Sequence, residues 1–335
     1  MGSRADIAWG KGEFSFEAVE SWSRLPPGIE LGDVAGIAID ARDRVYLFNR
    51  GPDPVVVVSR EGEFLNSWGR GLFVNPHGAS IGPDDSLYLT DNGAHTVRKF
   101  TTGGKLLLTV GEAGKPSAFM SGKPFCRCTH TALSPEGDIY VSDGYWNACV
   151  HKYTPDGRHL FSWGSPGTGP GEFNLPHNIA CDADGLVYVA DRENHRVQVF
   201  DADGRYVRQI NNMHRPSALA IVGTRCPCFL LGELAPYLPV NRETPNIGAR
   251  LTIMGNDGAL LGRIGSRRAG LEPGQFVSPH TIAVDSHGDL YVGEVIANDW
   301  NAVFPEVLQP SPLRRMQKFA RVAAPTRQEE VVAGA

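Results

Sequence analysis

The chain has 335 residues, of which 41% are hydrophobic and 21% are charged, and its formal net charge is −5. This composition is typical of a soluble globular protein. The chain has no basic run of the kind that binds nucleic acid, and no apolar stretch approaches the about 18 residues that a membrane helix needs. We therefore expect neither a nucleic-acid nor a membrane partner.

The N-terminus and the cysteines indicate the compartment. The segment MGSRADIAWGKGEF has no apolar stretch of the kind that secretory signals contain. Six cysteines in a chain of this length do not form a disulfide framework, and the pairs Cys126/Cys128 and Cys226/Cys228 are one residue short of the usual zinc spacing. We expect all six to be reduced, which favours a cytoplasmic location.

In chain order, the first predicted element is an N-terminal strand at residues 13–22. Many short runs of Val, Ile, Leu and Tyr follow, separated by 39 glycines and 24 prolines, as is typical of short strands joined by tight turns. No long segment has helical periodicity, so we predict an all-β fold. The last predicted strand, LRRMQKFARV from Leu313, is expected to share a sheet with the first, and residues 323–335 to form a frayed tail.

A repeated motif organises the strands between these ends. Each copy has a small or Pro-flanked residue, an apolar pair, an Asp/Gly turn and then xYVxD. Spacings of roughly 40 to 55 residues, with four strands per copy, are typical of β-propeller blades. We predict one domain over residues 1–335, a six-bladed propeller of four-stranded antiparallel blades around a central channel. The copies begin at Gly32, Asn75, Cys128, Phe173, Arg215 and Ser278, and the fifth is degenerate.

A histidine occupies one position in alternate copies. When the copies are aligned on the turn residue before xYV, the position eight residues earlier is histidine in copies two, four and six. This position begins the strand that should line the channel, so the imidazoles are expected to converge from blades about 120° apart. Around the ring the column reads Ala35, His77, Thr129, His177, Ser217 and His280.

Three converging imidazoles with an open position predict a zinc site held by His77, His177 and His280. Zinc in such a site polarises oxygen ligands. The alternative interpretation is that the Pro-His pair is a favoured repeat residue whose imidazole bonds a blade carbonyl. His130 lies one residue past the column. It is a candidate for contacting the substrate or supporting the site, with a packed polar role as the alternative.

The remaining histidines and three aspartates receive structural interpretations. The histidines fall in predicted loops or outer strands and are expected on the surface. The aspartates end the xYVxD strands and are expected to bond turn amides. The two groups are His95, His151, His159, His195, His214 and His287, and Asp91, Asp143 and Asp191.

Four segments carry a family resemblance: NPHGASI, SDGYWNACVHKYTPDGRHLFSWG, PGEFNLPHNIACDADGLVYVADRENHRVQVF and SPHTIAVDSHGDLYVG. They resemble the NHL-repeat propeller of peptidyl-α-hydroxyglycine α-amidating lyase, and the resemblance extends from about Gly32 to Gly293. It implies that the three channel histidines bind zinc. It also implies cleavage of the C–N bond of an N-acyl hemiaminal, which yields a primary amide and an aldehyde.

The resemblance implies roles for three further residues. Tyr145 in DGY corresponds to a family tyrosine, and Arg192 in ADREN and Arg50 in FNRG correspond to family arginines. An ionised Tyr145 could take the hydroxyl proton, and the arginines could bind a carboxylate and stabilise charge on the departing group. The structural alternatives are aromatic packing between blades for the tyrosine and blade-edge salt bridges for the arginines.

The sequence departs from the family at its disulfides. The two matching positions pair Cys126 with Trp146 and Val187 with Val199, so neither bridge can form. This agrees with a reducing compartment and argues against a secreted peptide-processing role.

A second departure concerns calcium. The family's structural calcium is held by two backbone carbonyls, which correspond to Ile37 and Ala79, and by an Asp whose position here is Thr281. One calcium ligand of the family is therefore missing.

The end of blade six, YVGEVIANDWNAVFPEV, also differs from the family. Glu294, Asp299 and Trp300 are expected to reshape the channel mouth, so the family's substrate cannot be transferred to this chain.

Three functions follow from the sequence. The first is a zinc-dependent lyase that acts on a small N-acyl hemiaminal and releases a primary amide and an aldehyde or keto acid. The second is a zinc-dependent hydrolase of the lactonase or amidase type, although lactone-opening propellers usually have a calcium site lined by Glu, Asn and Asp. The third is a non-catalytic NHL binding platform, which has no use for a histidine triad.

Overall fold

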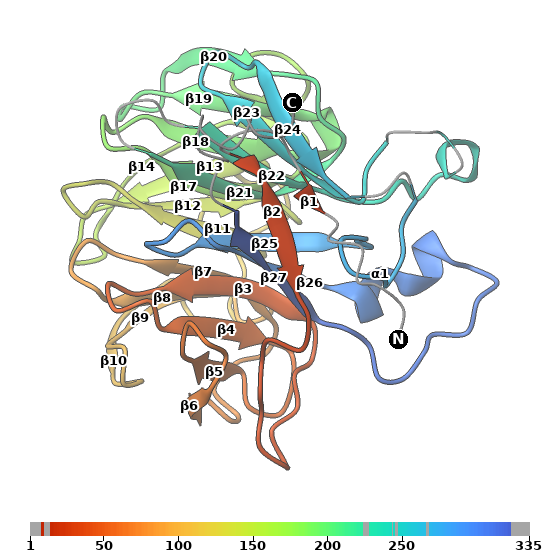
Figure 1. The fold of residues 1–335 in the computed structure, drawn as a ribbon. Helices are drawn as coiled ribbons and strands as arrows, with labels where there is room; N and C mark the ends of the chain where they lie inside the picture. The colour runs from red at the N-terminus through yellow and green to blue at the C-terminus, as the bar shows by residue number, and fades with distance from the viewer. Residues whose placement is uncertain are drawn as a thin grey trace, which may run out of the picture.

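Six β-sheets of four or five strands form the blades of the computed structural model (Figure 1). The structure describes residues 8–9, 14–223, 228–242, 244, 247–265 and 268–322, so the predicted tail at 323–335 lies outside the described residues. The innermost strand of each blade contacts that of the next, and the sixth contacts the first, which closes the ring. The predicted all-β six-bladed propeller is confirmed.

The first five blades are each built from four consecutive strands, and the sixth combines strands from both ends of the chain. Blade one consists of β3 (Val34–Ile39), β4 (Val45–Asn49), β5 (Val55–Val58) and β6 (Phe64–Trp68). Blade two consists of β7 (Pro76–Ile81), β8 (Leu87–Asp91), β9 (Thr96–Phe100) and β10 (Leu106–Val110). Blade three consists of β11 (Cys128–Leu133), β12 (Ile139–Asp143), β13 (Cys149–Tyr153) and β14 (His159–Trp163). Blade four consists of β17 (Pro176–Cys181), β18 (Val187–Asp191), β19 (Arg196–Phe200) and β20 (Tyr206–Ile210). Blade five consists of β21 (Pro216–Val222), β22 (Cys228–Glu233), β23 (Arg250–Gly255) and β24 (Leu260–Ile264). Blade six consists of β25 (Pro279–Val284), β26 (Leu290–Glu294), β27 (Met316–Arg321), β2 (Phe16–Val19) and β1 (Ala8–Trp9).

The sixth blade joins the two ends of the chain. Strand β2 pairs antiparallel with β27, and Phe16 lies opposite Arg321. Phe16 is 3% exposed and belongs to the apolar core shared by blades five and six. The pairing therefore ties the first described strands to the last one.

The burial pattern explains why each segment occupies its place in a blade. The second strands, such as VYVAD of β18, are buried along their whole length because neighbouring blades cover both faces. The fourth strands, such as YVRQI of β20, are largely exposed. The turn residue used to align the copies has a left-handed φ in every regular blade, which explains the preference for Asp and Gly there. These residues are Asp43 (57°), Asp85 (60°), Gly137 (91°), Gly185 (80°) and Gly288 (86°).

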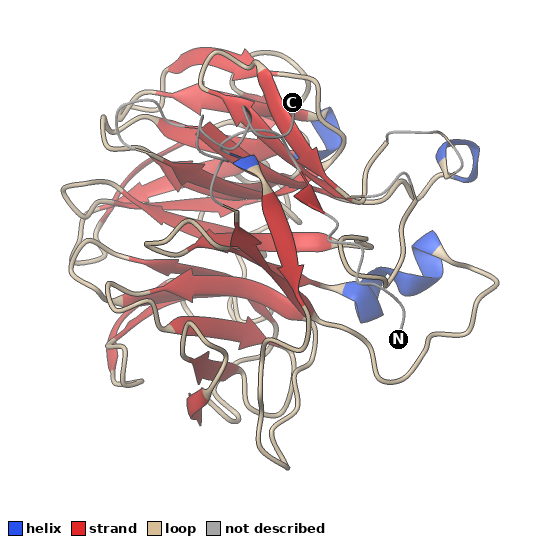
Figure 2. Cartoon of the chain, in the orientation of Figure 1, coloured by secondary structure: helices blue, strands red, loops and turns tan. Residues whose placement is uncertain are grey.

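Two short elements lie on one face of the ring. The helix α1 (Ile296–Val303) and the 3₁₀ turn η3 (Pro239–Asn241) both project from this face (Figure 2). The other short elements are β15 (Ser165–Pro166), β16 (Glu172–Phe173) and η2 (Arg192–Asn194). None of the helices in the described residues has the length and apolar character needed to span a membrane.

Candidate metal centre

The three column histidines are the second residues of innermost strands. His77, His177 and His280 lie on β7, β17 and β25. In each of these strands the register of pairing with the second strand of the blade shifts at the histidine, so the histidine has no partner residue on that strand. A bulge re-aims the side chain of the extra residue. The bulge thus directs each imidazole out of the sheet and toward the axis.

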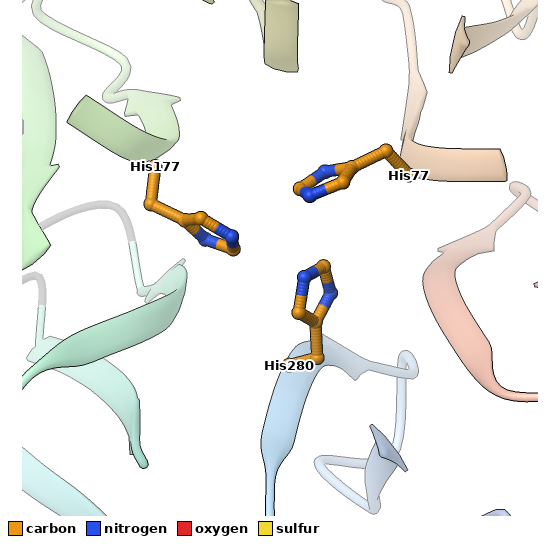
Figure 3. A group of neighbouring side chains, drawn as sticks. All are labelled: His77, His177 and His280. Carbon is orange, nitrogen blue, oxygen red and sulfur yellow. The ribbon is translucent and has the colours of Figure 1, made fainter. Parts of the chain in front are cut away.

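The three imidazoles meet at one place (Figure 3). The rings of His77, His177 and His280 are 4.6 to 4.9 Å apart between centroids. Their candidate ligand atoms all lie within 4.8 Å of one another, and the side chains are at most 4% exposed. A single cation can reach all three, so this buried triad could bind a metal ion.

Hydrogen bonds set the tautomer of each ring. The Nδ1 atoms of His77, His177 and His280 lie 2.6, 2.7 and 2.8 Å from the backbone oxygens of Thr129, Ser217 and Ala35. A carbonyl oxygen can only accept, so Nδ1 carries the hydrogen and the Nε2 lone pair is left for the centre. Each accepting oxygen belongs to the residue that takes the place of the histidine in the next blade. The blades without a histidine at this position therefore orient the imidazoles of the blades that have one.

The imidazoles are neutral in the absence of a ligand. Burial, followed by the charge of a neighbouring histidine, holds the pKa of His77 and of His177 well below the usual value. Burial and the charge of Arg50 lower the pKa of His280 to about 3. Neutral imidazole is the form that binds a metal ion.

A second set of hydrogen bonds supports the backbone before each histidine. Thr129 Oγ1 donates to the Pro176 oxygen at 3.0 Å, and Ser217 Oγ donates to the Pro279 oxygen at 2.9 Å. Ala35 has no hydroxyl to offer in blade one, and there Arg50 Nε donates to the Pro76 oxygen at 3.2 Å. The roles of Thr129 and Ser217 were not predicted, although their small hydroxyl side chains in alternate column positions were a usable signal.

Tyr145 reaches the triad from blade three. It lies in the loop after β12, and its hydroxyl is 3.3 Å from Nε2 of both His77 and His177. Arg192 Nη1 donates to the same hydroxyl at 3.5 Å, and its guanidinium lies 5.6 Å from the centre of the tyrosine ring. The structure thus brings Tyr145 and Arg192 together with the histidines.

Arg192 is held by an acidic neighbour. It is 9% exposed, and its Nε donates to Glu193 Oε1 at 2.8 Å. Glu193 also accepts from Arg215 at 2.9 and 3.0 Å. Burial would raise the pKa of Glu193, but hydrogen bonds from Arg215 and the charge of Arg192 lower it to about 2. Arg215 in turn lies 4.0 Å from the centre of the Tyr237 ring. Glu193 lies in the ADREN segment that carries the family resemblance, whereas no sequence pattern pointed to Arg215 or Tyr237.

Two other predicted residues lie beside the triad. The half-buried Arg50 follows β4, and its charge contributes to the low pKa of both His77 and His280. His130 packs against Gly78, where an added Cβ would lie 2.7 Å from the His130 ring. Burial lowers the pKa of His130 to about 4, and its Nδ1 has no partner among the described residues.

The prediction of surface positions for the other histidines is partly wrong. His151 is fully buried and His95 is 8% exposed, while His214 is half-buried. His151 lies on β13, where its side chain points into the blade and contacts Asp143. The exposed members are His159, His195 and His287.

The expectation that the strand-ending aspartates bond turn amides is confirmed for Asp91, which accepts from the backbone nitrogens of Gly93 and Ala94, and all three aspartates also accept from the segment before the innermost strand. Asp91 accepts from the backbone nitrogens of Val74 and Asn75. Asp143 accepts from that of Cys126, and Asp191 from that of Asn174. These bonds hold the segment entering each innermost strand.

The calcium position of the family is not reproduced. Thr281 Oγ1 accepts a hydrogen bond from the backbone nitrogen of Ile37 at 3.1 Å. A neutral hydroxyl replaces a carboxylate, whereas calcium prefers six to eight oxygen ligands including carboxylates. The residues therefore do not fit this ion.

The end of blade six consists of Glu294, the last residue of β26, and of α1, which contains Asp299 and Trp300. Glu294 is buried and accepts from the backbone nitrogens of Val277 and Ser278. Asp299 accepts from Ser278 Oγ, and Trp300 donates to a backbone oxygen within the following loop. The insertion is therefore an ordered part of the blade.

Comparisons with known proteins agree with this architecture. A family model described as NHL repeat matches residues 73–100 and 173–200. The chain is 28% identical to mouse peptidyl-glycine alpha-amidating monooxygenase over 86% of its own length and 32% of that protein. It is 32% identical to peptidyl-alpha-hydroxyglycine alpha-amidating lyase 1 of Drosophila melanogaster, over 70% of this chain and 45% of that one. The chain spans about a third of the length of the first of these relatives.

A further relative and two solved structures are also similar to this chain. Human NHL repeat-containing protein 3 is 32% identical over 62% of both chains. A gluconolactonase from Xanthomonas campestris has a TM-score of 0.60 at 12% identity, covering 95% of this chain and 96% of its own. Virginiamycin B lyase from Staphylococcus aureus has a TM-score of 0.53 at 14% identity, covering 80% and 79%. At such identities the two structures show the fold alone.

Proposed function

We propose that this chain, an NHL-repeat six-bladed propeller related to the peptidyl-α-hydroxyglycine α-amidating lyases, is a zinc-dependent lyase. Its substrate would be a small N-acyl hemiaminal, which it would convert to a primary amide and an aldehyde or keto acid. The observation that carries the proposal is the convergence of three buried, neutral imidazoles with the Tyr145 hydroxyl 3.3 Å from two of them.

The donor set favours zinc. His77, His177 and His280 would hold the ion, and three nitrogen donors with an open position are typical of catalytic zinc sites. Imidazole suits zinc better than it suits calcium, which prefers oxygen ligands. When bound, zinc would supply a Lewis acid that polarises a substrate oxygen.

In this proposal Tyr145 acts as the proton acceptor. Collapse of a hemiaminal requires removal of the proton from its hydroxyl group, formation of the C=O bond and departure of the amide nitrogen with the electron pair of the C–N bond. Tyr145 would take the hydroxyl proton, and the same proton would end on the amide nitrogen. Arg192 Nη1 donates a hydrogen bond to the Tyr145 hydroxyl at 3.5 Å and would hold this oxygen toward the substrate.

The two arginines would bind an anionic substrate group. Within the described residues the Arg50 side chain makes one hydrogen bond, from Nε to the Pro76 oxygen, which leaves its terminal nitrogens for a ligand. Arg192 is oriented by Glu193 through its own Nε. Guanidinium groups recognise carboxylates through paired hydrogen bonds, so the two side chains suit a substrate with a carboxylate beside the reacting carbon.

The direct test combines elemental analysis of the purified protein with an assay on α-hydroxyhippurate. We expect the triad to contribute about one zinc ion per chain, which is the ion that His177→Ala loses, and we expect benzamide and glyoxylate to be released in equal amounts, measured by chromatography. A gluconic or aliphatic lactone assayed in parallel tests the hydrolase alternative. Lactone opening without amide release would favour the hydrolase, and protein without bound metal would contradict both enzymes.

Replacing Arg50 by Gln tests the carboxylate contact. We expect KM for α-hydroxyhippurate to rise by about 10- to 100-fold, because a charged hydrogen-bond donor is lost. The methyl ester of the same substrate has no carboxylate, so its KM should differ little between Arg50→Gln and the parent protein. Arg42→Gln, at an exposed position of the same blade, is the matched control. An equal loss with acid and ester would contradict the assignment.

A further inference from the structure

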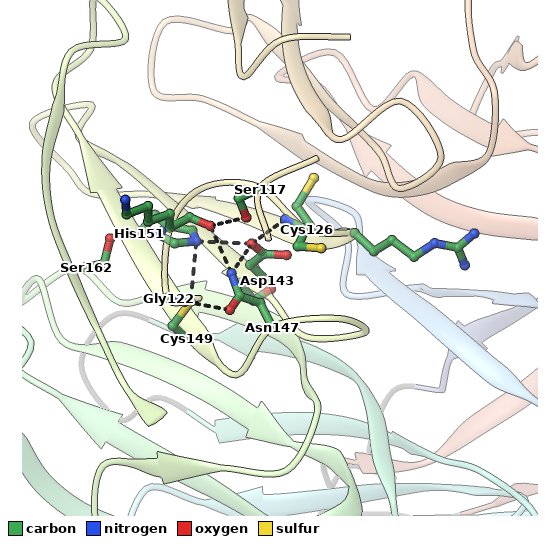
Figure 4. Close-up of polar contacts among 12 residues, drawn as sticks. Ser117, Gly122, Cys126, Asp143, Asn147, Cys149, His151 and Ser162 are labelled. Carbon is green, nitrogen blue, oxygen red and sulfur yellow. Dashed lines mark hydrogen bonds and ion pairs between the residues drawn. The ribbon is translucent and has the colours of Figure 1, made fainter. Parts of the chain in front are cut away.

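A second group of metal-ligating side chains lies inside blade three. Asp143 ends β12, and Cys149 and His151 lie on β13. All three are at most 1% exposed, and their ligand atoms lie within 4.8 Å of one another. Figure 4 shows the three side chains meeting in the interior of the blade. None of them belongs to the histidine triad.

The composition of this group differs from that of its counterpart in blade four. There Asp191 Oδ2 accepts from Arg196 Nε at 2.8 Å and from Gln198 Nε2 at 3.2 Å. Arg196 pairs with Asp191 across the strands as Cys149 pairs with Asp143. Blade three therefore has a thiol and an imidazole where blade four has two side chains that donate hydrogen bonds and cannot take part in a zinc site.

The distances match those between the ligands of a tetrahedral zinc ion. Zinc–ligand bonds of about 2.3 Å to sulfur and about 2.0 to 2.2 Å to nitrogen or oxygen place S and N about 3.5 Å apart, and N and O about 3.4 Å apart. Cys149 Sγ lies 3.5 Å from His151 Nε2, and that nitrogen lies 3.2 Å from Asp143 Oδ2. His151 Nδ1 lies 2.7 Å from Ser162 Oγ, a contact that orients the ring.

The two oxygens of the Asp143 carboxylate differ in their hydrogen bonding. Asp143 Oδ2 also accepts from the Cys126 backbone nitrogen at 2.8 Å and from Asn147 Nδ2 at 3.0 Å. Its Oδ1 is buried and has no hydrogen-bond partner among the described residues. A buried carboxylate with an unpartnered oxygen is costly, and a cation bound through Oδ2 would offset the charge of the whole carboxylate. Burial and the charge of Asp143 raise the pKa of Cys149, so without a cation the thiol keeps its proton.

We propose that Asp143, Cys149 and His151 form a second metal site, which binds a zinc-class divalent cation. Binding releases the Cys149 thiol proton to solvent and leaves the thiolate as a ligand. Asp143 and Cys149 flank the loop Gly144–Ala148, which carries Tyr145. The cation joins the two ends of this loop and holds Tyr145 in position. Metal binding here does not depend on the proposed reaction, although its effect on Tyr145 does.

Cobalt substitution tests the site directly. The whole chain is produced with Co²⁺ as the only added transition metal, so that the buried site fills during folding. We expect two ions per chain and a thiolate-to-cobalt absorption band in the near ultraviolet, which the all-nitrogen triad cannot produce. Cys149→Ser should lose the band and one ion. Cys181→Ser, at a half-buried thiol outside this group, is the control and should keep both.

Two further variants separate this site from the triad. His151→Gln copies the Gln198 arrangement of blade four, so it should fold and bind one ion without the band. His177→Ala should keep the band and the blade-three ion. If the proposed lyase activity were absent, the expected numbers of cobalt ions bound by the parent protein and its variants would stay the same. The proposal is overturned if the parent protein binds cobalt without the band, or if His151→Gln retains it.

Discussion

His177→Ala is expected to release the metal ion of the triad and to abolish amide formation while the propeller stays folded. The substitution removes one of three nitrogen ligands, and the remaining pair, His77 and His280, cannot form a three-ligand zinc site. The apolar cores between blade four and its two neighbours do not include His177, so the loss of one imidazole and its bond to the Ser217 oxygen should lower the free energy of unfolding by about 1–3 kcal/mol.

The measurement is the metal content per chain, together with amide release and thermal unfolding followed by circular dichroism. His287→Ala, at an exposed histidine of blade six, is the matched control and should retain metal and activity. If His177→Ala were fully active, the triad could not be the reacting centre. An unfolded variant would be replaced by His177→Gln, which keeps a polar side chain of similar volume.

Tyr145→Phe is expected to retain the triad's metal ion and to lose turnover. The change removes only the hydroxyl that lies 3.3 Å from two imidazole nitrogens, and the half-buried ring remains. A positioned proton acceptor typically contributes about 10²- to 10⁴-fold to a rate, so kcat should fall by this factor with little change in KM. Metal content and kcat, measured on the same preparation, distinguish this result from a loss of metal.

A neighbouring aromatic residue provides the control for this variant. Trp146 is 42% exposed and does not contact the triad histidines, so Trp146→Phe should leave kcat unchanged. Equal kcat values for Tyr145→Phe and the parent protein would exclude Tyr145 as the base. The role would then have to be assigned to another group near the triad, such as the neutral His130.

Around the ring, histidines alternate with small residues at the second position of the innermost strand, and this alternation has a physical reason. An imidazole that presents Nε2 to a metal needs an acceptor for its Nδ1 hydrogen, and the carbonyl in the next blade supplies it. A histidine in all six positions would crowd the axis. Small residues, Ala35, Thr129 and Ser217, leave room for the imidazoles, and two of them also donate a hydroxyl to the following blade.

The sequence alone determined the architecture and the triad. A repeat with a fixed turn and alternating strands specifies a blade, and six copies specify the ring. Once the blades are aligned, a residue at the same place in each copy must lie at the same distance from the axis. His77, His177 and His280 were therefore predicted to converge without knowledge of any contact, and the structure brings them together.

Only the tertiary structure decided how the residues outside this column meet. Tyr145, in the loop after β12 of blade three, reaches His77 of blade two across 68 positions of the chain. The pairing of Glu193 with Arg192 and Arg215, and the burial of His151 beside Asp143, follow from side-chain direction and packing. The repeat pattern does not record such contacts, since they occur in one blade and not in the others.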